Sequence, residues 1–178
     1  CLVGSEMCIR DSHVIIQTPY VICNGYMYDV LQGISDHAKL QIVLNAVEKG
    51  SNPWGCTDYL NQKKKILETG ADVYELMNDY PVHTKAVLIN DRLSVVGSYN
   101  LDMRSTYLDT ELMLVIDSEK LSQQIHETES DYMEKSKEVL ANGQETEGAK
   151  YQGKVLNRKK KLYYGVLRII IRPLRQLL

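Results

Sequence analysis

The chain has little cysteine and no long hydrophobic run. Its 178 residues include four cysteines, none of them in a C-x-x-C pair: Cys1, Cys8, Cys23 and Cys56. This pattern supports neither a zinc site nor a disulfide scaffold, and it favours a reducing, cytoplasmic setting. The longest apolar stretch of the C-terminal segment, residues 162–167, is far shorter than the roughly 20 residues of a membrane-spanning helix.

The N-terminus has neither an initiating methionine nor a signal peptide. The first residues, CLVGSEMCIRDS, do not fit the pattern that follows, and they resemble the translated read-through of a sequencing or assembly adaptor. We therefore expect a non-native leader over residues 1–12.

Acidic residues are absent from the C-terminal segment. Residues 154–178 carry eight Lys or Arg and no Asp or Glu, so the rest of the chain holds 13 basic and 23 acidic residues, a net charge of −10. An acidic body argues against nucleic-acid binding. The basic segment instead indicates contact with an anionic surface.

Hydrophobic patterning predicts an α/β fold, a mixed β-sheet flanked by helices. Apolar runs predict buried strands over residues 13–20 and 109–117 and further strands over 39–46 and 71–77. Helical periodicity predicts helices over residues 25–37, capped by Asn24, and over 57–69, ended by Gly70. A long helix capped by Asp117 or Ser118 is predicted to follow, with an apolar stripe that reaches Val139 and Leu140. A strand, a helix and a strand in succession imply a parallel crossover.

The clearest chemical pattern lies between residues 83 and 100. It consists of H-x-K, an apolar run, a polar break at residues 90–91, a second apolar run and then G-S-x-N. Two apolar runs around an Asn-Asp break predict a β-hairpin, which brings His83 and Lys85 to the same end as Ser98 and Asn100. An imidazole, an ammonium, a hydroxyl and a carboxamide together suit an anionic phosphate ester.

This pattern resembles the phospholipase D superfamily, the HKD phosphodiesterases, and within it the bacterial cardiolipin synthase group. The resemblance extends from Val14 to Glu119 and includes the run NLDMRS after the second strand. The site residues that it implies are His83, Lys85, Ser98, Asn100 and Glu111.

One position departs from the family pattern. The family has Asp seven residues after the His, where this chain has Asn90. In the predicted hairpin Asn90 lies in the turn, remote from the phosphate, and Asn tolerates the left-handed backbone of a turn. The departure therefore affects the formal motif more than its chemistry.

The resemblance also implies a reaction without a metal or a cofactor. One His attacks phosphorus and forms a phosphohistidine, while a second His protonates the leaving alcohol and activates the incoming one. In family members with two motifs, the His of the second motif usually serves as the acid/base. The resemblance therefore implies this role for His83, with the nucleophile on a missing N-terminal half or a second copy. Lys85, Ser98 and Asn100 would bind phosphoryl oxygens, and Glu111 would accept the second ring N–H of His83.

Three neighbouring residues have two interpretations each. Tyr20 is expected to be a half-buried aromatic residue rather than part of the site, and Trp54 fits a substrate cleft or surface packing equally. Arg104 is expected to form an ion pair with Asp102 or Asp109 rather than to contact phosphate.

We accordingly expect a phospholipase D-like catalytic half-domain over residues 13–145, a linker over 146–153 within the polar run 141–153, and a basic amphipathic tail over 154–178. The tail would lie on lipid or pack against the missing half. The implied enzyme is a phosphatidyltransferase acting on a phosphatidylglycerol-like phospholipid at the cytoplasmic face of the cell membrane. The alternatives are a dimeric nuclease of the same superfamily and a membrane-binding module without catalysis.

Overall fold

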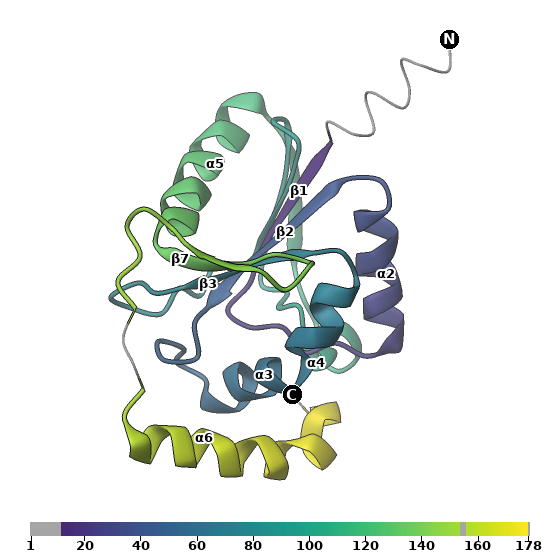
Figure 1. The fold of residues 1–178 in the computed structure, drawn as a ribbon. Helices are drawn as coiled ribbons and strands as arrows, with labels where there is room; N and C mark the ends of the chain where they lie inside the picture. Colours follow the sequence, from purple (N-terminus) through teal and green to yellow (C-terminus); the bar gives the residue numbers. More distant parts are fainter. Residues whose placement is uncertain (1–11, 154–155, 178) are drawn as a thin grey trace.

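The computed structural model describes residues 12–153 and 156–177, and the strands among them form one mixed, eight-stranded sheet (Figure 1). In chain order they are β1 (His13–Gln17), β2 (Lys39–Asn45), β3 (Asp72–Leu76), β4 (Ala86–Ile89), β5 (Leu93–Gly97), β6 (Met113–Asp117), β7 (Ser136–Val139) and β8 (Glu145–Glu147). The order across the sheet is β6-β5-β4-β1-β2-β3-β7-β8. The pairs β1–β2 and β2–β3 are parallel, as the predicted crossover requires, and the other pairs are antiparallel.

Helices pack on both faces of this sheet, which confirms the predicted fold class. They are α2 (Gly25–Ser35), α3 (Pro53–Glu68), α4 (Met103–Tyr107), α5 (Glu119–Glu134) and α6 (Arg158–Ile171), and α6 runs into a 3-10 helix, η1 (Arg172–Leu177). Side chains of a strand point alternately to the two faces. In β1, Val14 and Ile16 therefore join the core under α2 and α3, whereas Ile15 joins the core under α5.

The predicted start of α2 is confirmed, whereas α3 begins four residues earlier than expected. Asn24 caps α2 by accepting from a backbone N–H at 3.0 Å. Asn52 caps α3 in the same way, and Pro53 occupies its first turn. An Asn cap followed by Pro is a helix-start signal that the prediction of a loop here overlooked. The predicted end of α3 is confirmed, because Gly70 has a φ of +87°, a conformation that favours glycine.

The strand predicted over residues 109–117 is shorter and more exposed than expected. β6 begins at Met113 and forms one edge of the sheet. Leu114 and Val115 are 57% and 71% exposed, so the prediction of a buried strand was wrong. Its apolar residues are typical of a buried strand, but no other strand of the described residues pairs with its outer edge.

Two segments after α5 form strands instead of a longer helix and a linker. The helix ends at Glu134, and Val139, predicted to continue its apolar stripe, lies in β7 opposite Val73. β8 lies within the polar run 141–153 and pairs with β7. Helical periodicity and polar composition are local signals, whereas a strand forms when a distant partner offers its free backbone groups.

The basic tail packs on α3 of the same chain (Figure 1). The sequence predicts that it lies on lipid or packs against a missing half, and neither interpretation includes this contact. Leu167 and Ile171 are buried in this contact. Arg175 donates two hydrogen bonds to the fully buried Asp58, at 2.6 and 2.9 Å. A bidentate pair of this kind fixes the orientation of the tail as well as its position. None of the helices within the described ranges combines the length and the apolar character needed to span a bilayer.

Helix α5 carries a buried acid, Glu129, on its inner face. Its side chain is 1% exposed, and its Oε2 atom has no hydrogen-bond partner among the described residues. Burial raises the pKa of Glu129 to about 8. Between the ordinary pKa of about 4.5 and this value, the folded chain keeps a proton that the unfolded chain releases. Stability therefore falls as the pH rises through this window.

We predict that Glu129→Gln removes this pH dependence and raises the free energy of unfolding by on the order of 3 kcal/mol at pH 7, less the cost of burying an amide. Thermal unfolding of the two chains at several pH values between about 5 and 8.5 measures the effect. Glu127→Gln, an exposed change of the same charge on the same helix, is the control. A wild-type stability that stays constant over this window would contradict the prediction.

Candidate active site

The β4–β5 hairpin brings the two halves of the motif to one end of the sheet. Its register pairs Ala86 with Val96, and the Gly97 N–H donates to the carbonyl of Lys85 at 3.2 Å. The turn at the other end contains Asn90, whose φ is +52°. The predicted hairpin and the turn position of Asn90 are therefore confirmed. Residues 83–85 precede β4 rather than belonging to it.

Ser98 is held between the hairpin and the segment that leads into β6. Its backbone N–H donates to the carbonyl of Leu112 at 3.0 Å, and its Oγ accepts from the Leu112 N–H at 3.0 Å. This close approach requires glycine at position 97, because a Cβ there would lie 2.0 Å from the Leu112 carbonyl oxygen. Ser98 Oγ donates in turn to a carboxylate oxygen of Glu111, which lies just before β6.

Asn100 is positioned by a short helix that replaces the predicted polar connection. Its backbone N–H and its Nδ2 lie 3.3 and 3.4 Å from Ser105 Oγ and donate to it. Asp102 caps α4 by accepting from the Ser105 N–H at 2.6 Å. The run NLDMRS thus encodes a capped turn of helix whose first residues hold Asn100 beside the hairpin.

Lys85 is a buried cation beside the exposed ring of His83. Only 8% of Lys85 is exposed, and its Nζ donates to the His83 carbonyl at 2.8 Å and lies 2.7 Å from Nδ1 of the ring. Burial lowers the pKa of Lys85, while the carboxylates of Glu111 and Asp102 oppose that shift. Burial and the neighbouring ammonium together lower the pKa of His83 and favour its neutral form.

Glu111 faces Ser98 rather than His83. Hydrogen bonds from Ser98 and then Ser105, followed by the charges of Lys85 and Arg104, lower the pKa of Glu111. No contact between Glu111 and the His83 ring occurs among the described residues. In this arrangement the carboxylate orients the serine hydroxyl and partly neutralises the buried ammonium.

The structure adds two residues to the predicted set. Asp102 is 2% exposed, and its charge acts on Lys85, while Ser105 hydrogen-bonds to Asn100. Both belong to NLDMRS, and the D-x-x-S spacing of a helix cap was the signal that could have found them. Arg104 binds Asp109 at 2.9 Å, so one of its two predicted ion pairs is confirmed.

Tyr20 packs against the start of α3, and Trp54 belongs to the first turn of that helix. Tyr20 is half-buried, as expected, and its ring packs so close to Gly55 that a Cβ there would lie 2.8 Å from it. Trp54 is 40% exposed. Tyr20 thus contributes packing between β1 and α3, where glycine is needed for the contact.

Comparison with known proteins agrees with the motif and the fold. Residues 9–131 match the family described as "Cardiolipin synthase, PLD-like domain". The chain belongs to this phospholipase D-like family. Cardiolipin synthase A from Proteus mirabilis is 30% identical over 150 residues, and that from Serratia proteamaculans is 29% identical. Each alignment covers 82% of this chain but 29% of the relative, so the chain spans less than a third of the length of these phospholipase D-like relatives.

Solved structures share the phospholipase D-like fold. Phosphatidylserine synthase from Haemophilus influenzae superposes with a TM-score of 0.66 at 15% identity, covering 99% of this chain and 44% of that chain. Nuc from Salmonella typhimurium, a phospholipase D family member, superposes with a TM-score of 0.56 at 15% identity, covering 77% and 89%. At these identities the likeness concerns the fold.

We predict that Asn90→Asp leaves the free energy of unfolding of the 178-residue chain within about 0.5 kcal/mol of wild type. Asp tolerates the positive φ, and its carboxylate can still accept from the His13 N–H, which now bonds to Asn90 Oδ1 at 3.0 Å. Asn90→Val should cost about 1–2 kcal/mol, because a β-branched residue resists this conformation. Denaturant unfolding of the three chains measures both effects, and equal losses in the two variants would rule out the turn argument.

Proposed function

We propose that this chain is one half of a phosphatidyltransferase of the cardiolipin synthase type, which joins two phosphatidylglycerol molecules through a phosphohistidine. The observation that carries the proposal is the convergence of His83, Lys85, Ser98, Asn100 and Glu111 at one end of the hairpin. The similarity to cardiolipin synthase A supports the choice of substrate.

The reaction proceeds in two displacements. A His from the other half attacks the phosphorus of the first phosphatidylglycerol, the bond to glycerol breaks, and the His83 imidazolium donates its proton to the departing glycerol oxygen. The neutral His83 then takes the proton from a hydroxyl of the second phosphatidylglycerol. That oxygen attacks the phosphohistidine, which releases cardiolipin and the free nucleophile.

The pKa of His83 suits the second displacement directly. Burial and Lys85 favour the neutral imidazole, which is the form a general base needs. The first displacement needs the protonated form. A phosphodiester anion bound beside the ring stabilises that form, because an adjacent negative charge raises the pKa of an imidazole.

The remaining groups bind the phosphoryl oxygens. Lys85 supplies a positive charge that is little screened by water, because it is buried. Asn100 supplies a neutral donor whose position is set by Ser105, and Ser98 supplies a second one when its hydroxyl proton turns from Glu111 to the phosphoryl oxygen. We propose that Glu111 acts by orienting Ser98 and by keeping Lys85 protonated despite its burial.

The surface beside these residues is suited to the other half. Between α4 and the end of the sheet, five large apolar side chains are more than half exposed: Tyr107, Leu108, Leu112, Leu114 and Val115. Large apolar side chains that stay exposed are typical of an interface. We propose that the half carrying the nucleophilic His, from a longer chain or a second copy, covers this surface and places its ring opposite His83.

The outward face of α6 is suited to an anionic membrane surface. Leu162 and Ile169 are each 71% exposed, and Tyr163, Val166 and Ile170 are about half exposed on the same helix. Exposed Lys159, Lys160 and Lys161 precede them. We propose that α6 stays packed on α3 through its inner face while these side chains enter the lipid interface.

We predict that a full-length protein containing this chain and a second motif converts phosphatidylglycerol to cardiolipin and glycerol, whereas the 178-residue chain alone does not. His83→Ala should lower turnover by at least about 100-fold, because acid–base catalysis contributes factors of this size. Lipid products are measured by mass spectrometry. His37→Ala, a change of an exposed His just after α2, is the control.

Two outcomes would overturn this assignment. One is undiminished turnover in a folded His83→Ala protein. The other is cleavage of DNA without any turnover of phospholipid, which would favour the nuclease alternative.

We predict that the 178-residue chain binds vesicles containing phosphatidylglycerol, and that Leu162→Ser/Ile169→Ser weakens binding by at least about tenfold, because two buried apolar side chains are lost from the interface. Added salt should weaken binding further. Leu112→Ser is the matched control for co-sedimentation, because Leu112 is about as exposed as Leu162 and Ile169 but lies outside α6. Equal binding by all three chains would exclude α6 as the contact.

A further inference from the structure

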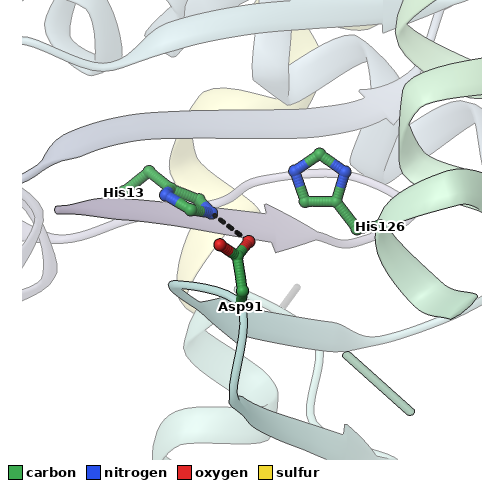
Figure 2. A group of neighbouring side chains, drawn as sticks. All are labelled: His13, Asp91 and His126. Atoms are coloured by element: carbon green, nitrogen blue, oxygen red, sulfur yellow. Dashed lines mark ion pairs between the residues drawn. The ribbon is translucent and has the colours of Figure 1, made fainter. Parts of the chain in front are cut away.

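A cluster of metal-binding side chains lies at the turn end of the hairpin. Figure 2 shows His13 from the start of β1, Asp91 from the β4–β5 turn and His126 from α5 turned toward one another. One potential ligand atom from each lies within 4.8 Å of the others. The four residues of β4 separate this cluster from His83 and Ser98 by roughly 13 Å, so it is distinct from the candidate active site.

His13 Nε2 lacks the partner that its burial calls for. The atom is buried, although a quarter of the side chain is exposed, and it has no hydrogen-bond partner among the described residues. The nearest carboxylate oxygen, Asp91 Oδ1, lies 3.6 Å away, beyond hydrogen-bonding distance. The ring of His126 stands edge-on at a centroid distance of 5.8 Å. A cation between the three side chains would satisfy this nitrogen.

We propose that His13, Asp91 and His126 bind a divalent cation of the zinc type. Two imidazole nitrogens and one carboxylate oxygen are a usual zinc donor set, with a water molecule as the fourth ligand. At bond lengths of about 2.0–2.2 Å, the ligand atoms of a tetrahedral site lie roughly 3.4 Å apart. The His13–Asp91 distance is already close to this value. Asp91, with 86% of its side chain exposed in the turn, can rotate to close the remaining gap.

One ring nitrogen of His126, Nδ1, already has a hydrogen-bonding partner. Ser130, one turn further along α5, has its Oγ 3.2 Å from His126 Nδ1. This leaves Nε2 as the metal ligand. Metal-binding imidazoles are usually oriented by such a hydrogen bond on the other ring nitrogen.

The surroundings of the cluster favour a cation. An open pocket of about 560 Å³ at the cluster is lined by Asp91, Arg92 and four residues of α5: Glu119, Gln123, His126 and Glu127. Arg92 is paired with Asp117 through hydrogen bonds of 2.6 and 2.8 Å, which neutralises its charge. The carboxylates in the pocket therefore leave an excess of negative charge, and the opening gives an ion access from solvent.

A bound ion would cross-link three elements that are distant in the sequence. It would tie the first strand and the hairpin turn to α5, at the end of the sheet opposite the phosphodiester chemistry. The absence of paired cysteines does not bear on this site, because its ligands are imidazole and carboxylate groups. The expected consequence is a gain in folding stability, since an ion that binds only the folded chain stabilises it.

The test uses the chelator-treated 178-residue chain carrying Cys1→Ser and Cys8→Ser, which remove two competing thiols. This chain is titrated with zinc chloride, and calorimetry measures the binding. We expect one equivalent to bind and the midpoint of thermal unfolding to rise. Cobalt(II) in the same site should show the visible absorption of a four-coordinate complex. His126→Ala and Asp91→Asn should each weaken zinc binding by at least about tenfold.

His37→Ala is the matched control, because His37 is an exposed histidine just after α2, its ring is bonded to the Gly33 carbonyl, and it does not belong to the cluster. It should bind zinc as wild type does. Unfolding of the metal-free variants checks that they fold. Zinc binding that is equal in wild type and His126→Ala would overturn the proposal, as would an unfolding midpoint that zinc does not move, the result expected if His13 and Asp91 form only an ion pair.

Discussion

The antiparallel register of the β4–β5 hairpin is the constraint on which the site depends. Because Ala86 lies opposite Val96, Lys85 and Gly97 share one end, and every other group of the site is positioned from there. The pairing of β4 with the central strand β1 holds the hairpin in the sheet. A slip by one residue would turn the polar side chains to the opposite face and separate them from the segment before β6.

The pKa values in the site depend on Lys85, a buried ammonium with two carboxylates nearby. Lys85 loses most of its hydration, and its charge is sustained by Glu111 and Asp102. Partial burial and this ammonium lower the pKa of the His83 ring and favour its neutral form. Glu111 serves a double purpose, because it also bonds to Ser98. The hydrogen bonds of Ser98 and Asn100 hold their side chains in place in the folded chain, the kind of preorganisation on which electrostatic catalysis depends.

Two exposed apolar surfaces indicate what the rest of the assembly would cover. One lies along β6, beside the site, and the other along the outer face of α6. They differ in charge, because lysines precede the α6 face, whereas Glu111 and Asp117 flank the β6 edge. Under the proposed function, the first would be covered by another protein surface and the second would meet anionic lipid. The ion pair between Arg175 and Asp58 keeps the C-terminal segment on α3.

Local patterns determined the order of the first strands and helices, the cap at Asn24 and the turn at Asn90, since each depends on residues close together in the chain. The candidate site residues were predicted from the resemblance to a family, and the structure brings them to one end of the hairpin. The tertiary structure decided the rest. Glu111 bonds to Ser98 instead of His83, Val139 joins a strand, the basic tail packs on α3, and His13, Asp91 and His126 converge at one point. Each of these results depends on contacts between residues far apart in sequence. Local patterns do not predict such contacts, because a sheet edge or a buried polar group finds its partner only when the whole chain is folded.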